Sequence, residues 1–208
     1  MIAAISLMRR QEQVDLARFR RHWLDVHGPL VCAFAGLHRY VQCHVIESPA
    51  MNDLARSMRI DGFPILYFAN DEDRAKAHGS PEMAACNVDS RLFVGAVSRV
   101  LTDVEPVVPL AEGRGRISLI LLCPEGCGET PVVAALGRLA GLPGLRGLTR
   151  YRVREQGRAP ASTIPHLPVT VDAVAQARFD NVVDLECALS DWDDPGMARF
   201  VVEEHWLV

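Results

Sequence analysis

The sequence lacks the features that would place the protein in a membrane, on nucleic acid or in a secretion pathway. None of its 208 residues belongs to an apolar run long enough to cross a bilayer, and no basic segment precedes an apolar run as in a signal peptide. Basic residues do not exceed acidic ones, and the formal net charge is −4. We therefore expect a cytoplasmic protein with neither a membrane nor a nucleic-acid partner.

The six cysteines are too dispersed to indicate a disulfide framework. Cys123 and Cys127 form the one close pair, and no second pair of ligands stands at the spacing of a zinc site. We interpret the cysteines as thiols in a reducing compartment and expect no metal site.

An internal repeat is the most informative pattern in the sequence. The segment 36–41 (GLHRYV) recurs as 147–152 (GLTRYR), and each copy follows a helical segment and opens a strand-like run. Three flanking pairs occur in the same order: 2–8 with 117–123, 61–68 with 180–187, and 104–105 with 202–203. Gly62 and Asn181 stand at matching positions, and both residue types tolerate a positive φ. We therefore expect the two halves to share a turn or bulge there.

Each half reads as strand, helix, strand, strand, helix, strand. This order predicts an α+β fold of two ferredoxin-like βαββαβ halves, 1–108 and 115–208, each with an antiparallel sheet that has both helices on one face. The bare faces need a partner, so we expect the two sheets to pack face to face around a small-molecule cavity.

The individual elements can be placed by their caps and breakers. The first helix begins at Asp15 and is expected to end at His27, with Gly28 in the left-handed position and Pro29 unable to continue it. Further segments are assigned as follows: strand 63–69, helix from Asn70 with a break at 79–81, further helical turns at 89–97, strand 99–108, helix from Thr130, and loop 156–168.

The second predicted strand carries the candidate site. Side chains alternate along a strand, so residues 38–45 divide into a polar and an apolar set. The polar set is His38, Tyr40, Gln42 and His44, and the apolar set is Val41, Cys43 and Val45. We expect the apolar set to lie under the helices and the polar set to line the space between the sheets. If that space is open to water, the polar set is an ordinary solvated strand face.

His27 is the second candidate. It shares a helical stripe with Leu16 and Trp23, so its side chain should point to the interior. The helix C-terminus favours its protonated form and burial favours its neutral form, a combination suited to proton transfer near neutral pH. The alternative is a capping role on the last carbonyls of the helix.

Three motifs of the first half resemble a known family. Phe19-x2-His22-Trp23-x3-His27-Gly28-Pro29, then Arg39-Tyr40-Val41-Gln42-x-His44, then Asp61-Gly62 before an aromatic strand, are similar to the EthD-like family of the ferredoxin-like dimeric α/β-barrel group. The resemblance covers about residues 1–108, and the second half is a degenerate copy. It implies that the chain builds an intrachain dimeric α/β-barrel, and it leaves a homodimer of such chains open.

The resemblance also implies cofactor-free chemistry on a small cyclic or aromatic compound. We assign His27, Tyr40 and His44 as catalytic residues, with His27 moving the proton. The assigned substrate-binding residues are Trp23, Gln42, His38, Tyr67 and Phe68. The resulting hypothesis is an isomerase or a lyase/dehydratase. The alternatives are a non-catalytic small-molecule binding protein and a fully filled barrel that serves stability or assembly.

The sequence departs from the family at several positions. Ile65 stands where the family often has an acidic residue, and the second half has no counterpart of Trp23, His27 or His44, so we expect one site per chain. By the repeat alignment, three arginines should face the helices of the second half: Arg150, Arg152 and Arg154. Charged side chains are unusual on a strand face that packs against helices.

Overall fold

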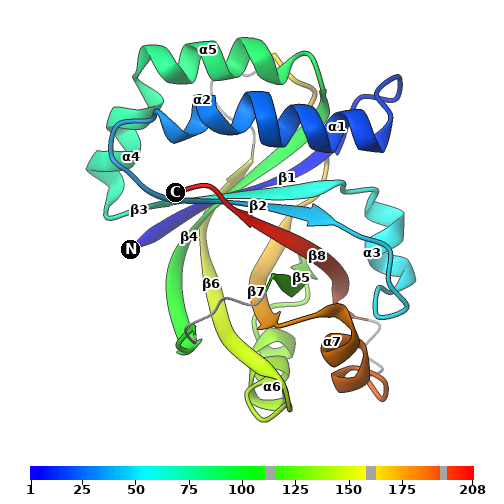
Figure 1. Ribbon diagram of the computed structural model, residues 1–208. Helices are drawn as coiled ribbons and strands as arrows, with labels where there is room; N and C mark the ends of the chain where they lie inside the picture. Colours follow the sequence, from blue (N-terminus) through cyan, green and yellow to red (C-terminus); the bar gives the residue numbers. More distant parts are fainter. Residues whose placement is uncertain (111–115, 158–162, 193–195) are drawn as a thin grey trace.

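The computed structural model describes residues 1–110, 116–157, 163–192 and 196–208, and its strands form one closed barrel with helices outside it (Figure 1). The strands are β1 (Ile2–Arg10), β2 (Leu37–Val45), β3 (Gly62–Phe68), β4 (Val94–Val108), β5 (Ile117–Pro124), β6 (Leu145–Gly157), β7 (Val171–Phe179) and β8 (Ala198–Trp206). The helices are α1 (Leu16–His22), the π-helical η1 (Trp23–His27), α2 (Gly28–Cys32), α3 (Asp53–Met58), α4 (Asp71–His78), α5 (Pro81–Ser90), α6 (Thr130–Leu139) and α7 (Val182–Ala188).

Around the barrel the strands follow the order β1-β3-β2-β8-β5-β7-β6-β4, and every neighbouring pair is antiparallel. The strands of the first half are neighbours in the order β4-β1-β3-β2, and those of the second half in the order β8-β5-β7-β6. Two seams join the halves, β2 with β8 and β4 with β6. The α+β fold with antiparallel strands is confirmed, and the sheets expected face to face are opposite walls of a single barrel.

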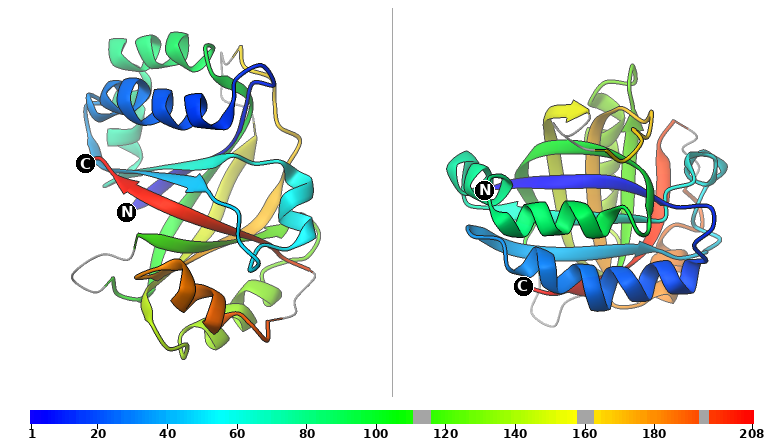
Figure 2. Two further views of the ribbon diagram at one scale, coloured as in Figure 1. Left: turned by 45° about the vertical axis from the view of Figure 1, so that its right-hand side comes forward. Right: turned by 90° about the horizontal axis from the view of Figure 1, so that it is seen from above.

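Helices cover the barrel on two opposite sides. Helices α1, α2 and α5 lie across the strands of the first half, and α6 and α7 lie against the second half (Figures 1 and 2). Because the strands have side chains packed on both faces, they are apolar on both, as in β1 and β5.

Side chains from both halves fill the barrel interior, where we expected a small-molecule cavity. The ring of Phe63 on β3 packs against Phe200 on β8 with centroids 5.1 Å apart. The hydroxyls of Tyr67 on β3 and Tyr151 on β6 lie 2.6 Å apart and are fully enclosed. A large apolar cluster surrounds these rings.

A buried ion pair lies at the centre of the polar contacts inside the barrel. Arg178 on β7 donates from Nε to both carboxylate oxygens of Glu204 on β8, at 2.9 and 3.2 Å. Gln176 donates to Glu204 at 2.7 Å and accepts from Arg178 and from Tyr151, at 2.7 and 2.8 Å. A charge buried this deeply is tolerated only with such partners.

Two predicted elements were wrong. The segment 180–187, paired with a strand of the first half, contains helix α7 instead, because the Asn181 side chain accepts from the Asp184 N–H and caps a helix. The third strand of the second half is β7. In the first half α5 ends at Ser90 and β4 already begins at Val94, so only the first two residues of the helical segment predicted over 89–97 are helical.

Gly62 does not have the positive φ expected of it, whereas the arginines of the second half lie on the expected side of their strand. Gly62 is not among the residues with positive φ, and instead a Cβ there would lie 2.4 Å from the Trp23 ring. The arginines of β6 alternate with Tyr151, whose hydroxyl lies inside the barrel, so they lie on the outer side that bears the helices, where Arg150 pairs with Glu129 at the start of α6. They form ion pairs with acids: Arg150 with Glu105, Arg152 with Asp103, and Arg154 with Asp71, at 3.4, 3.5 and 3.0 Å.

The interior ion pair yields a prediction for stability. The substitution Glu204→Gln leaves the buried Arg178 without its counter-charge and should lower the free energy of unfolding by about 3 kcal/mol. Urea denaturation measures this loss. As a control, Asp180→Asn removes an exposed ion pair with Arg146 and should cost less than about 1 kcal/mol. Equal small losses in the two variants would contradict the importance of the interior pair.

Candidate functional site

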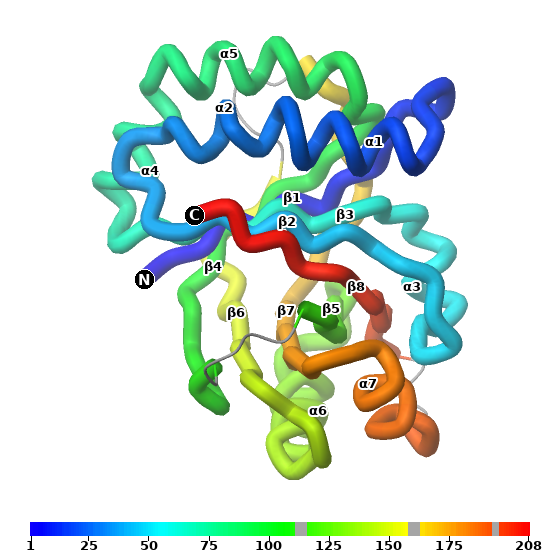
Figure 3. The backbone as a smooth tube through the Cα atoms, viewed as in Figure 1, coloured from blue at the N-terminus to red at the C-terminus, as the bar shows by residue number. Residues whose placement is uncertain are grey.

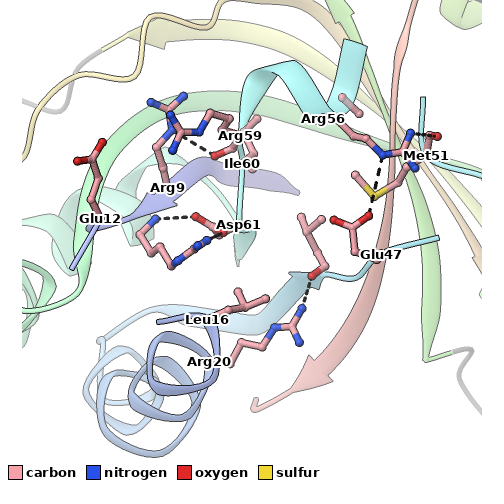
Figure 4. A pocket seen from close by; sticks show the side chains of 13 residues that line it. Arg9, Glu12, Leu16, Arg20, Glu47, Met51, Arg56, Arg59, Ile60 and Asp61 are labelled. Carbon is pink, nitrogen blue, oxygen red and sulfur yellow. Dashed lines mark hydrogen bonds and ion pairs between the residues drawn. The ribbon is translucent and has the colours of Figure 1, made fainter. Parts of the chain in front are cut away.

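A cleft of about 500 Å³ lies between α1, α3 and the ends of β1 and β2 (Figure 4). Its walls carry five arginines: Arg9, Arg10, Arg20, Arg56 and Arg59. Most of their guanidinium groups already have partners in the same cleft. Arg10 pairs with Asp61, Arg9 donates to the carbonyl of Met58 at 2.9 Å, and Arg56 donates to that of Met51 at 2.7 Å. None of the predicted site residues lines this cleft, and we assign it a structural role.

A smaller cavity, of about 100 Å³, lies between the outer face of the first-half strands and helices α2, α4 and α5. Most of its wall is apolar, from residues such as Val31, Phe34 and Phe68. The polar and ionisable groups of the described wall are Ser6, His27, Tyr40, His78, Cys86, Asn87, Ser90 and Arg99. An apolar enclosure with a few converging polar groups is the usual form of a small-molecule site.

A π turn positions the histidines beside this cavity. The helix does not end at His27 as predicted: Gly28 has φ −53° and the helix continues to Cys32. Pro29 has no N–H for the carbonyl four residues earlier and its ring would collide with that carbonyl, which disfavours regular α-helix here. Instead the Gly28 N–H donates to the carbonyl of Trp23, five residues earlier.

This π turn also explains how two histidines reach one carboxylate. Five residues separate His22 from His27, and in a regular α-helix their side chains would point roughly 140° apart. In the π turn the i and i+5 positions align. His27 Nδ1 donates to Asp89 Oδ2 at 2.8 Å, and His22 Nε2 donates to Asp89 Oδ1 at 2.9 Å. The structure therefore shows a contact of His27 with α5 where the alternative interpretation placed a bond to the last carbonyls of its own helix.

The second ring nitrogen of His27, Nε2, carries no hydrogen and can therefore accept a proton. Because the carboxylate of Asp89 only accepts, Nδ1 carries the hydrogen and Nε2 has a free lone pair. The thiol of Cys86 lies 3.3 Å from Nε2 and donates to it. Burial lowers the pKa of His27, and the hydrogen bond that Nδ1 donates to Asp89 opposes that shift. Burial raises the pKa of Cys86 to about 12, so the thiol stays protonated.

Tyr40 adds a hydrogen-bond donor to the cavity. Its hydroxyl oxygen accepts from Trp23 Nε1 at 3.0 Å and from Gln42 Nε2 at 3.1 Å. Two donors occupy both lone pairs, so the hydroxyl hydrogen remains available for a further acceptor. Burial raises the pKa of Tyr40, which keeps it a neutral donor. Gln42 also donates to the carbonyl of Trp23 at 2.8 Å and so ties β2 to the π turn.

The two faces of β2 are the reverse of the prediction. Tyr40, Gln42 and His44 lie under the helices, and Cys43 faces the barrel interior, where Gln176 approaches its sulfur at 3.7 Å. Polar residues occupy the helix side because Trp23 and the π-turn carbonyl provide partners for them. The predicted residues therefore come together, but on the outer side of the barrel wall.

The remaining predicted residues divide between supporting positions and positions away from the cavity. His44 stacks on Trp23 with centroids 4.4 Å apart and contacts Gln42 at 3.0 Å, so it lies behind the wall that Tyr40 forms. Phe68 lines the cavity, Tyr67 faces the barrel interior, and His38 is exposed.

Asp89 and Cys86 were missed by the sequence analysis. They are three residues apart on α5, which places them on the same helix face. This spacing could have indicated a paired role. The predicted helical segments, however, broke at 79–81 and resumed only at 89–97, so they did not place both residues on one helix. In the described residues, no group of three or more histidine, cysteine or acidic side chains is arranged to hold a metal ion.

Comparisons with known proteins agree with the resemblance. Residues 11–96 match the family model of the EthD domain. A solved structure of an anthrone oxidase-like protein has a TM-score of 0.66 at 10% identity, covering 99% of this chain and 93% of its own. An ethyl tert-butyl ether d (EthD) family protein from Bacillus halodurans C-125 is 21% identical, covers 50% of this chain and 97% of its own, and has a TM-score of 0.42.

The likeness to the anthrone oxidase-like protein shows a common fold over nearly the whole chain. A search of the curated proteins gave no match. In the part of the chain that the structure describes, none of the helices has the length and apolar character needed to cross a membrane.

The buried His44 gives a prediction for the pH dependence of stability. Burial, followed by the charges of His205 and Arg20, lowers its pKa from 6.5 to about 3. As the pH falls below 6.5 the unfolded chain gains a proton that the folded protein does not, so stability is lost. Between pH 7 and pH 5 this loss is about 2 kcal/mol.

Urea denaturation at the two pH values measures this effect in the wild type and in His44→Gln. The variant should lose less stability than the wild type over the same interval. The exposed His166, replaced in His166→Gln, serves as the control and should leave the pH dependence unchanged. An identical dependence in the wild type and His44→Gln would contradict the assignment of a neutral, buried His44.

Proposed function

We propose that this chain, whose residues 11–96 are an EthD domain, is a cofactor-independent isomerase or lyase/dehydratase acting on a small cyclic or aromatic compound. His27 is its proton-transfer residue. The observation that carries the proposal is the position of His27, which lines a largely apolar cavity: Nδ1 is held by Asp89 at 2.8 Å, while Nε2 contacts only the thiol of Cys86, another lining residue, among the contacts described. A base oriented by a carboxylate is the arrangement that general acid–base catalysis requires.

The neighbouring groups support this role. The lowered pKa of His27 keeps its imidazole neutral, and therefore basic, at physiological pH. Removal of a proton from a carbon next to a carbonyl develops negative charge on the carbonyl oxygen. Tyr40 lines the same cavity, and its hydroxyl hydrogen, which neither Trp23 nor Gln42 engages, is the donor that would stabilise that oxygen.

Cys86 occupies the approach to His27 Nε2 in this structure. A substrate carbon that takes its place brings its hydrogen to Nε2, so the thiol must turn aside when the substrate binds. Because burial raises the pKa of Cys86 to about 12, the thiol is a poor nucleophile here, and we favour proton transfer by His27 over attack by sulfur.

We also interpret the two halves as a tandem duplication in which the second copy has lost the site. The identical strand order in each half supports this interpretation, as do the matching caps, where Asn70 and Asn181 each accept from a backbone N–H three residues later. The second copy supplies β8 and β6, which complete the barrel beside β2 and β4.

Deuterium exchange tests the proposed reaction without knowledge of the natural substrate. Small cyclic carbon acids, such as α-angelica lactone and 2-tetralone, are incubated with the protein in D2O, and loss of the proton next to the carbonyl is followed by NMR. We expect the wild type to accelerate exchange, and His27→Gln to reduce the acceleration at least about 100-fold. Asp89→Asn should act in the same direction because it releases the His27 ring.

His166→Gln is the matched control, since this exposed histidine lies outside the cavity wall and should leave exchange unchanged. Thermal unfolding shows whether each variant is folded. Equal exchange in the wild type and in a folded His27→Gln would contradict the proposal. If the same probes bind saturably without exchange, the chain is a non-catalytic small-molecule binding protein, which is the alternative function.

The pH profile of exchange gives a separate prediction. The neutral form of His27 is the active base, and burial lowers its pKa below 6.5. Exchange should therefore stay at its plateau at pH 6.5 and fall only at lower pH, as the ring becomes protonated. A profile with its midpoint at or above pH 6.5 would show that another group is the base.

A further inference from the structure

The cavity beside His27 has positive charge in its wall and no acid to balance it. Arg99 on β4 and His78 at the end of α4 both line the cavity, whereas the described lining contains neither aspartate nor glutamate. A guanidinium remains charged at every physiological pH. The wall therefore presents a fixed cation to a largely apolar space.

Four of the five acids on α4 and α5 are bound to other groups, and the fifth, Glu82, does not line the cavity. Asp89 on α5 accepts from His22 and His27. The acids of α4 pair with exposed cations: Asp71 with Arg154 at 3.0 Å, and Glu72 and Asp73 with Lys76 at 3.1 and 3.5 Å. Within the described ranges, the side chain of Arg99 takes part in neither an ion pair nor a hydrogen bond.

A second arginine adds to the charge at this end of the cavity. The Nε of Arg74 on α4 is buried and has no hydrogen-bond partner in the described residues. After burial, which is the larger cause, the charge of Arg74 lowers the pKa of both His78 and Arg99. Like charges brought together out of water are costly, and a bound anion removes that cost.

The arginine cleft of Figure 4 provides a contrast within the same protein. Its arginines share their walls with three acids, Glu12, Glu47 and Asp61, and with backbone carbonyls that accept their hydrogen bonds. The cavity beside His27 has none of this compensation among its described lining residues. It is therefore the better site for a negatively charged ligand, although it is smaller.

We propose that this cavity binds a small organic carboxylate, with the carboxylate on Arg99 and the carbon skeleton extending toward His27 and Tyr40. An arginine presents paired N–H groups that match the two oxygens of a carboxylate. Arg74 and His78 strengthen the positive potential at that end. The inference rests on the proposed function in placing the ligand in this cavity, and it adds the chemical class of the ligand.

Paired probes test the proposal. Three carboxylates are compared with their neutral amides of similar shape: acetate with acetamide, benzoate with benzamide, and phenylacetate with phenylacetamide. Binding is followed by NMR, using the signals of the His27 ring, in the wild type, Arg99→Gln and Arg99→Lys. We expect at least one carboxylate to bind about tenfold or more tightly than its amide. Arg99→Gln should abolish this preference, and Arg99→Lys should keep part of it.

Arg152→Gln removes an exposed arginine of β6 outside the cavity wall and should leave the preference unchanged. The proposal is overturned if no carboxylate binds more tightly than its amide in the wild type, or if a folded Arg99→Gln keeps the preference. Carboxylate preference together with exchange that does not depend on His27 would support the anion site and contradict the proposed reaction. The two proposals can thus fail separately.

Discussion

Closure of the barrel is the constraint on which the other features depend. Pairing of β2 with β8 and of β4 with β6 leaves neither half with a free edge, and it turns the inner faces of both halves toward one another. Rings and the Arg178–Glu204 pair then fill the interior. The cavity beside His27 lies instead on the outer face, between helices α2, α4 and α5 and the strands of the first half.

The arrangement of the site follows from one irregular helical turn. Pro29 disfavours regular hydrogen bonding, and the resulting π turn aligns His22 with His27 and directs the carbonyl of Trp23 toward Gln42 on β2. The same turn thus connects α5, through Asp89, with the strand that carries Tyr40. Gly62 has no side chain where the Trp23 ring packs, which allows the helix to approach the strands this closely.

The sequence allowed the α+β fold, the EthD resemblance and the strand positions of the first half to be predicted, because caps, breakers and alternation are local signals. It also singled out His27 and Tyr40, which the structure places in the wall of one cavity. It could not show which face of β2 meets the helices, since both faces are buried and Trp23 supplies polar partners from far along the chain. Asp89 was missed because its role depends on packing between helices, and α7 was missed because a seven-residue segment in which apolar residues alternate with acids suits either a strand or a helix.

The end of the described chain contributes directly to the first half. The Tyr40 N–H donates to the carbonyl of Val208 at 3.1 Å, the Leu207 N–H donates to the carbonyl of Tyr40 at 3.0 Å, and Figure 3 shows this end running along β2. On the ribosome, the first half therefore emerges with β2 and β4 uncovered until the second half has been made. Unpaired strand edges are templates for association with other chains. While about a hundred further residues are translated, the edges of β2 and β4 are therefore exposed to pairing with the wrong partner.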